Sequence, residues 1–113
     1  MNTFEQGLLT YLSPKQISRI QSKQIGIGGA GGLGSNVAVL LARCGFRRFV
    51  IMDFDHVEAA NLNRQFYFLN DLGEHKVDAL SRHLHAINPD IDCDSYNTSW
   101  HPGLANDPFK TCD

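Results

Sequence analysis

Residues 24–55 read QIGIGGAGGLGSNVAVLLARCGFRRFVIMDFD. The first five residues form a short apolar stretch that predicts a strand at 24–28, and a glycine-rich turn follows it. Residues 35–44 then show helical periodicity, and a second apolar run over 47–53 ends in an acidic residue. This order predicts a strand–turn–helix–strand unit, which is typical of an α/β fold with a parallel sheet.

The predicted helix has one apolar face. Four residues recur at positions i, i+3, i+4 and i+7, namely Val37, Leu40, Leu41 and Cys44. We expect this face to be buried and Cys44 to be a small core residue. Gly45 directly follows and is expected to end the helix.

The turn before this helix carries the pattern G-x-G-x-x-G. Its three pattern glycines are Gly29, Gly31 and Gly34, with Gly32 between them. Glycine lets the backbone turn tightly and approach a polyphosphate, and the helix N-terminus offers free N–H groups. Asp53 follows about 20 positions later, where an acid accepts hydrogen bonds from ribose hydroxyls. The unit therefore predicts a nucleotide site, with a tight structural turn as the alternative.

Size and composition exclude several other classes of protein. The 113 residues, with 42% hydrophobic and 19% charged, suit one ordinary globular domain or part of one. A net charge of −2 with scattered basic residues gives no nucleic-acid footprint. No apolar run approaches the roughly 18 residues of a membrane span, and the N-terminus lacks the basic region of a signal peptide. We expect no membrane contact and a cytoplasmic location.

Metal-binding and redox patterns are absent from the sequence. The three cysteines, Cys44, Cys93 and Cys112, are widely spaced and form no Cys-x-x-Cys pair. The five histidines also lack metal-ligand spacing, since His83 and His85 point to different faces of a helix. We therefore expect no metal bound through cysteine or histidine.

A long connection follows the second strand. Residues 54–73 exceed the roughly 12–15 residues above which loops in compact domains are uncommon and often functional. The aromatic run at 66–68 is expected to anchor this loop on the domain, at the carboxyl edge of the strands where α/β sheets bind ligands. The alternative is an irregular surface segment whose charged side chains are solvated. The candidate ligand-binding side chains of the loop are Asp55, Asn61, Asn63, Arg64 and Gln65.

An amphipathic helix is predicted at 74–88, with a third strand at 91–96. The apolar stripe of the helix is Val77, Leu80, Leu84 and Ile87. Lys76 lies in the first turn, where the helix dipole disfavours a cation, so we expect it to meet an anion. The whole pattern predicts an α/β Rossmann-like parallel sheet with helices on both faces, ending after about three strands.

A shorter helix is predicted ahead of the first strand. Ser13 and Gln16 match a capping box and Pro14 suits the first helical position, so this helix should run to about Ser22. Residues 1–12 show only a weak helical pattern.

Several of these stretches, in this order, resemble the ThiF/MoeB/HesA family, the bacterial relatives of ubiquitin-activating enzymes. They are GAGGLGS at 29–35, DFDHVEAANLNRQ at 53–65, Lys76 and INPD at 87–90. The run NRQFYFLNDLGEHKV at 63–77 is particularly similar to the ThiF members, adenylyltransferases for the sulfur-carrier protein ThiS.

The resemblance implies an adenylation reaction with ATP and Mg²⁺. The C-terminal Gly-Gly carboxylate of a small ubiquitin-fold carrier attacks the α-phosphate, and pyrophosphate leaves. By resemblance, the four glycines line the nucleotide loop and Asp53 holds the ribose hydroxyls. Asn61 and Arg64 contact the phosphates, and Lys76 neutralises charge on the pyrophosphate side. Asp55, Asn63 and Gln65 are assigned to the same nucleotide site, and relatives commonly form homodimers.

The sequence also departs from the family pattern. The family's magnesium-binding aspartate would lie just beyond Asp113, and the Cys-x-x-Cys pairs and sulfur-transfer cysteine of many relatives are absent. Ala60 stands where serine is usual, and no N-terminal helix clearly matches the arginine-bearing one of MoeB-like proteins. We therefore expect 1–113 to be the N-terminal nucleotide-binding part of a ThiF-type enzyme, with a helical segment at 1–22, that binds nucleotide weakly and has little or no activity.

Two other functions share part of this pattern. An NAD-binding domain of a dehydrogenase has the same glycine loop and acid, but it has no need of additional cations such as Arg64 and Lys76 near the pyrophosphate. A non-catalytic module that docks a partner would not depend on Arg64 for ATP affinity.

Overall fold

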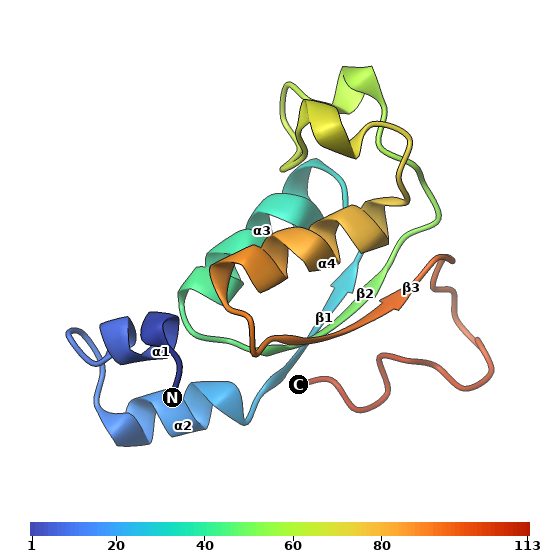
Figure 1. Ribbon diagram of the computed structural model, residues 1–113. Coiled ribbons are helices and arrows are strands. Elements are labelled where there is room, and N and C mark those ends of the chain that lie inside the picture. Colours follow the sequence, from blue (N-terminus) through green and yellow to red (C-terminus); the bar gives the residue numbers. More distant parts are fainter.

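Three parallel strands form the sheet of this protein, whose computed structural model describes residues 1–113 (Figure 1). They are β1 (Gln24–Gly28), β2 (Arg48–Met52) and β3 (Asp92–Tyr96), in the spatial order β1-β2-β3. Helix α3 (Gly32–Arg43) connects β1 to β2, and α4 (Lys76–Ile87) connects β2 to β3. The predicted α/β Rossmann-like parallel sheet and its three strands are confirmed.

Both connecting helices cover the same face of the sheet. Figure 1 shows α3 and α4 side by side. The strand order β1-β2-β3 means that both crossovers step in the same direction, and right-handed crossovers of this kind place their helices on one face of the sheet. The prediction had helices on both faces. Here the segment after β3 covers the opposite face, and its Phe109 ring lies against Gly26 and Gly28 of β1.

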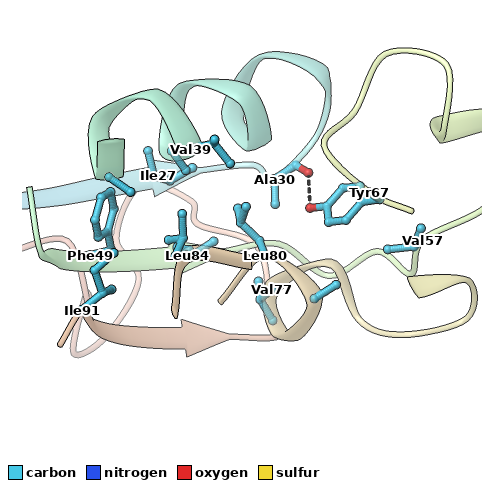
Figure 2. Packing of buried hydrophobic residues seen from close by; sticks show 14 residues of the cluster. Ile27, Ala30, Val39, Phe49, Val57, Tyr67, Val77, Leu80, Leu84 and Ile91 are labelled. Carbon is cyan, nitrogen blue, oxygen red and sulfur yellow. Dashed lines mark hydrogen bonds between the residues drawn. The ribbon is translucent and has the colours of Figure 1, made fainter. Parts of the chain in front are cut away.

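The hydrophobic core lies between this sheet face and the two helices (Figure 2). Alternate residues of the strands point into it, including Ile27, Phe49 and Ile51. From α4, Val77, Leu80 and Leu84 are almost fully buried and Ile87 is partly buried, as the sequence stripe predicted.

The buried face of α3 differs from the predicted one. Leu40 is 63% exposed and Cys44 is exposed, whereas Val37 and Leu41 are only partly buried. The buried residues are instead Ser35, Ala38, Val39 and Ala42. The prediction was wrong because it followed residue size. The start of the helix is held by the glycine loop, and this contact turns a row of mostly small side chains toward the sheet and α4.

The N-terminal segment packs at the amino ends of the strands, away from the glycine loop (Figure 1). It forms α1 (Thr3–Leu8) and α2 (Pro14–Gln21). The predicted capping box is confirmed, since Ser13 and Gln16 exchange hydrogen bonds of 2.9 and 3.2 Å. Buried Glu5 accepts from Arg47 at 3.3 Å and thereby ties α1 to the start of β2.

The end of α3 and the outer edge of β1 are each closed by the backbone. Gly45 has φ +109° and ends α3, as predicted. The outer edge of β1 is bonded at Gln24, whose carbonyl accepts from the Asp113 N–H at 2.8 Å.

No helix in the structure is long and apolar enough to cross a membrane.

The buried face of α3 predicts different effects on stability for substitutions at Ala42 and Leu40. Ala42→Leu should lower the free energy of unfolding by about 1–3 kcal/mol, because a larger side chain overfills the contact with the sheet. Leu40→Ala should change it by less than about 0.5 kcal/mol, because the removed atoms face solvent. Denaturant unfolding of both variants gives these values, and a larger loss for Leu40→Ala would restore the face predicted from the sequence.

Candidate functional site

A pocket of about 520 Å³ opens at the carboxyl ends of β1 and β2. Among the predicted site residues, Gly29, Asp53 and Asp55 line it. Its other walls include Phe54 and residues of the segment after β3, namely Ser99, Trp100, Asp107 and Phe109. The pocket therefore lies where open α/β sheets bind their ligands.

The glycine loop has a conformation that only glycine permits at two positions. Gly29 has φ +96°, in the region that side chains disfavour. A Cβ at Gly34 would lie 1.8 Å from the Gly29 carbonyl oxygen, so helix and strand approach more closely than any side chain allows. The N-cap of α3 is Gly31, which makes no side-chain capping bond. The first N–H groups of α3 are thus available to an anionic ligand.

Asp53 holds this loop as well as lining the pocket. Its Oδ2 accepts from the Ala30 N–H at 2.7 Å and its Oδ1 accepts from the Asp55 N–H at 2.7 Å. Each carboxylate oxygen has a further lone pair, so Asp53 can still accept from ligand hydroxyls. The sequence predicted only the ligand-binding role.

Tyr67 anchors the long loop on the glycine loop. Its hydroxyl donates to the Ala30 carbonyl at 2.6 Å and lies 3.4 Å from the Lys76 carbonyl oxygen (Figure 2). Burial, together with the charges of Asp53 and Asp71, raises the pKa of Tyr67, so the phenol stays a donor. The predicted aromatic anchoring is confirmed for Tyr67, whereas Phe68 is 55% exposed.

Arg64 lies beside the N-terminus of α3. Its side chain runs along Gly32, about 3.7 Å from the position of an added Cβ. One guanidinium nitrogen donates to the Ala60 carbonyl and to Asn63 Oδ1, each at 3.2 Å. The remaining donors of the planar guanidinium are suited to phosphate oxygens. Asn61 serves the loop itself, since its Oδ1 accepts from the Glu58 N–H at 2.8 Å.

Gln65 is a buried polar residue beside the glycine loop, and one atom of its side-chain amide has no hydrogen-bond partner. Its side chain is mostly buried, its Oε1 has no hydrogen-bond partner, and its amide nitrogen lies near Gly31. An unpaired buried amide oxygen is costly and needs an explanation.

Lys76 meets an anion within the chain. Its Nζ lies 3.8 Å from the Asp55 carboxylate, and its side chain is only 7% exposed. The Lys76 N–H also donates to the Asp55 carbonyl at 2.9 Å. The anion expected from the helix dipole is therefore Asp55 in the structure. Lys76, Arg64, Gln65, Asn61 and Asn63 are not among the residues that line the pocket.

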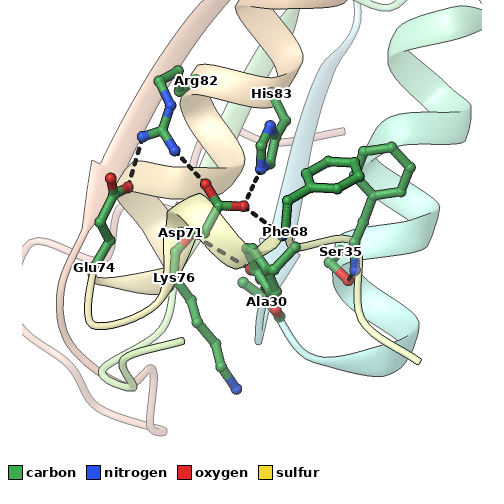
Figure 3. A network of polar contacts seen from close by, with 10 residues as sticks. Ala30, Ser35, Phe68, Asp71, Glu74, Lys76, Arg82 and His83 are labelled. Atoms are coloured by element: carbon green, nitrogen blue, oxygen red, sulfur yellow. Dashed lines mark hydrogen bonds and ion pairs between the residues drawn. The ribbon is translucent and has the colours of Figure 1, made fainter. Parts of the chain in front are cut away.

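A polar network attaches the far end of the loop to α4 (Figure 3). Asp71 is almost fully buried, accepts from the Phe68 N–H at 2.8 Å, and contacts His83 at 2.6 Å and Arg82. Arg82 also pairs with Glu74 at 2.6 Å. Burial works against ionisation of Asp71, but the Phe68 hydrogen bond together with His83 and Arg82 outweighs it and lowers its pKa.

Several residues of the site were not predicted from the sequence. The aromatic run predicts anchoring through its apolar rings, but it does not indicate the hydrogen bond of the Tyr67 hydroxyl. Phe54 stands between two aspartates with no pattern of its own, and the segment with Trp100, Asp107 and Phe109 carries only turn signals. A lone tryptophan in a loop after the carboxyl end of a strand was the available signal.

Comparison with known proteins gives one family and a consistent set of relatives. The model of the ThiF family matches residues 5–113. Ubiquitin-like modifier-activating enzyme 5 of Drosophila ananassae is 41% identical over 83 residues, which are 74% of this chain and 21% of that protein. The Bombyx mori enzyme is 43% identical over 79 residues, 70% of this chain and 20% of that one. The chain thus spans about a fifth of the length of these curated relatives.

Solved structures agree with this grouping. Escherichia coli TcdA, a tRNA N6-threonylcarbamoyladenosine dehydratase in complex with AMP, superposes with a TM-score of 0.79 and 27% identity, over 88% of this chain and 40% of that one. Escherichia coli MccB with ATP has a TM-score of 0.75 and 26% identity, over 88% and 31%.

The Asp71 network predicts a pH-dependent stability. The pKa of Asp71 is lower in the folded chain than in the unfolded chain. Ionised Asp71 therefore stabilises the fold above its unfolded pKa, and this stabilisation is lost as the pH falls from about 5 toward the folded pKa. Asp71→Asn should cost about 1–3 kcal/mol at pH 7 and flatten the acid limb of the stability curve. Asp94→Asn, at an exposed position of β3, is the matched control. Urea unfolding between pH 3 and 7 measures both, and parallel curves for Asp71→Asn and wild type would contradict the prediction.

The Tyr67 hydroxyl gives a second prediction. Tyr67→Phe keeps the ring and leaves the buried Ala30 carbonyl without this donor, so it should lower the free energy of unfolding by about 1–3 kcal/mol. Tyr11→Phe is the control, because Tyr11 is 85% exposed. Equal losses in thermal or denaturant unfolding would show that the hydrogen bond does not hold the loop.

Proposed function

Because this chain belongs to the ThiF family, we propose that it forms the nucleotide-binding part of an ATP-dependent adenylyltransferase. The enzyme would activate the C-terminal carboxylate of a ubiquitin-like carrier protein. The observation that carries the proposal is the glycine loop at the start of α3, with the pocket on one side and Arg64 on the other. The ubiquitin-like modifier-activating relatives and the neighbours with bound ATP or AMP support it.

The residues present suit ATP in three respects. Asp53 has free acceptor positions beside the pocket for ribose hydroxyls. The uncapped N-terminus of α3 offers N–H groups to phosphate oxygens. Gln65 has a buried oxygen without a partner beside the loop; phosphate oxygens only accept, so a water bound to the phosphates would donate to it. We propose that the nucleoside occupies the pocket and that the phosphates extend along Gly31 and Gly32 toward Arg64.

The proposed reaction needs stabilisation of negative charge more than acid–base chemistry. A carrier carboxylate attacks the α-phosphate, the bond to the β-phosphate breaks, and pyrophosphate leaves. Arg64 would hold phosphate oxygens through its free guanidinium donors, and Lys76 would oppose the charge that moves onto pyrophosphate. Lys76 is positioned by Asp55, whose carboxylate lies 3.8 Å from its nearly buried Nζ. Asn61 and Asn63 would act indirectly, by shaping the loop that carries Arg64.

No Mg²⁺ residue is assigned in this chain. No group of three or more histidine, cysteine or acidic side chains is arranged closely enough to hold a metal ion. Mg²⁺ commonly binds through substrate phosphates with one or two carboxylates and waters, so it would enter with ATP.

The identity of the carrier is a finer proposal. The run 63–77 favours a ThiS-like sulfur carrier of thiamine biosynthesis, whereas the curated relatives are named for a ubiquitin-like modifier. We keep the sulfur carrier as the proposed partner, and ATP–pyrophosphate exchange by the whole enzyme with each carrier class decides between them. A homodimer and a cytoplasmic location also stay predictions.

The site predicts ATP binding that depends on Arg64. Isothermal titration of this chain should give tighter binding of magnesium-ATP than of NAD. Arg64→Ala should weaken ATP binding by roughly 10- to 100-fold, since hydrogen bonds to charged groups contribute about 1.5–3 kcal/mol. Arg19→Ala, at an exposed position of α2, should leave it unchanged.

Two outcomes would reject the proposal. Tighter binding of NAD, unaffected by Arg64→Ala, would indicate an ordinary dinucleotide domain. ATP binding that is unchanged in Arg64→Ala would favour a non-catalytic module.

A further inference from the structure

The pocket has an aromatic end that the adenylation chemistry does not use. Phe54, Trp100 and Phe109 line it, and they come from two segments that follow β2 and β3. Phe109 is packed against Gly26 and Gly28 of the sheet. Phe54 and Trp100 keep 61% and 46% of their surface exposed, and the close aromatic pairs of the protein involve other rings. These two rings therefore present free faces at one pocket.

Charge separates this end of the site from the phosphate end. The polar side chains that line the pocket are the acceptors Asp53, Asp55 and Asp107 and the hydroxyl of Ser99, which both donates and accepts, with no cation among them. Arg64 lies beside Gly32, at the N-terminus of α3, and so outside the pocket wall. A polyphosphate would be repelled from the pocket and attracted to α3. A flat, uncharged heterocycle with N–H donors matches the pocket itself.

Chain order places the two kinds of group next to each other. Phe54 directly follows Asp53, whose carboxylate is the proposed acceptor for the ribose. A nucleoside held there by its sugar would have its base among the aromatic side chains. Stacking of a base on an aromatic side chain is a recurrent contact that tolerates different bases because each has a π face.

We propose that Trp100 stacks on the base of the bound nucleotide and holds the nucleoside in the pocket. This assignment rests on the proposed ATP site and adds a base-binding residue to it. Trp100 belongs to the segment after β3, which brings it to the glycine loop only in the folded chain. The contact would hold the nucleoside end while α3 and Arg64 hold the phosphates.

Trp100 is the sole tryptophan, so its fluorescence reports this contact directly. Magnesium-ATP should quench the fluorescence of the unmodified chain, whereas inorganic tripolyphosphate, which has no base, should not. In calorimetry, Trp100→Ala should weaken ATP binding by roughly 5- to 100-fold and leave tripolyphosphate binding unchanged. Trp100→Phe keeps a stacking ring and should stay within about threefold of the unmodified chain. Tyr11→Ala, at a position 85% exposed on the α1–α2 connection, is the control.

The outcomes distinguish a failure of the Trp100 base contact from a failure of the proposed ATP site. ATP affinity that is the same in Trp100→Ala and the unmodified chain, while Arg64→Ala still weakens it, would overturn the base contact alone. An equal loss of ATP and tripolyphosphate binding in both Trp100 variants would also overturn it, because the residue would then support the fold of the site. Failure of the unmodified chain to bind ATP at all would reject the nucleotide site together with the stacking residue.

Discussion

The hydrogen bond from the Ala30 N–H to Asp53 Oδ2 joins the glycine loop to the end of β2, and the site depends on this junction. On the other side of Ala30, its carbonyl accepts from buried Tyr67. The residue is thus held by both its backbone groups, from two different segments. Gly34 closes the loop further by its contact with the Gly29 carbonyl. These contacts set how the N-terminus of α3 points, and therefore where an anion can be bound.

The same loop separates two chemically different halves of the site. Below it lies a pocket that three aspartates line without any cation, and whose apolar walls include exposed aromatic rings. Beside it lie the helix N-terminus, Arg64 and buried Gln65. Lys76 is the nearly buried cation of the region, and its pairing with Asp55 explains how a lysine is tolerated in the first turn of a helix. A nucleoside polyphosphate has the same division between an uncharged ring system and a charged tail.

Stability and site are coupled through the long loop. The loop is attached to the glycine loop by Tyr67 and to α4 by Asp71, whose buried carboxylate is ionised because Phe68, His83 and Arg82 surround it. Arg64 precedes Tyr67 by three residues in the chain, and its backbone carbonyl accepts from Asn36 of α3 at 2.9 Å. The position of the arginine therefore depends on Asn36, which bonds its carbonyl, and on Ala60 and Asn63, which bond its guanidinium.

Local sequence patterns determined the order of strands and helices, the capping box at Ser13, the end of α3 at Gly45, and the glycine loop with Asp53. Each of these depends on neighbours in the chain, through periodicity, backbone freedom or capping. Tertiary structure decided what neighbours cannot encode. It turned Ala38 and Ala42 of α3 inward and left Leu40 in solvent, because the contact of Gly34 with Gly29 sets the rotation of the helix. It likewise brought Trp100 to the pocket, paired Lys76 with Asp55, and aimed the Tyr67 hydroxyl at Ala30, since these partners meet only after the sheet has formed.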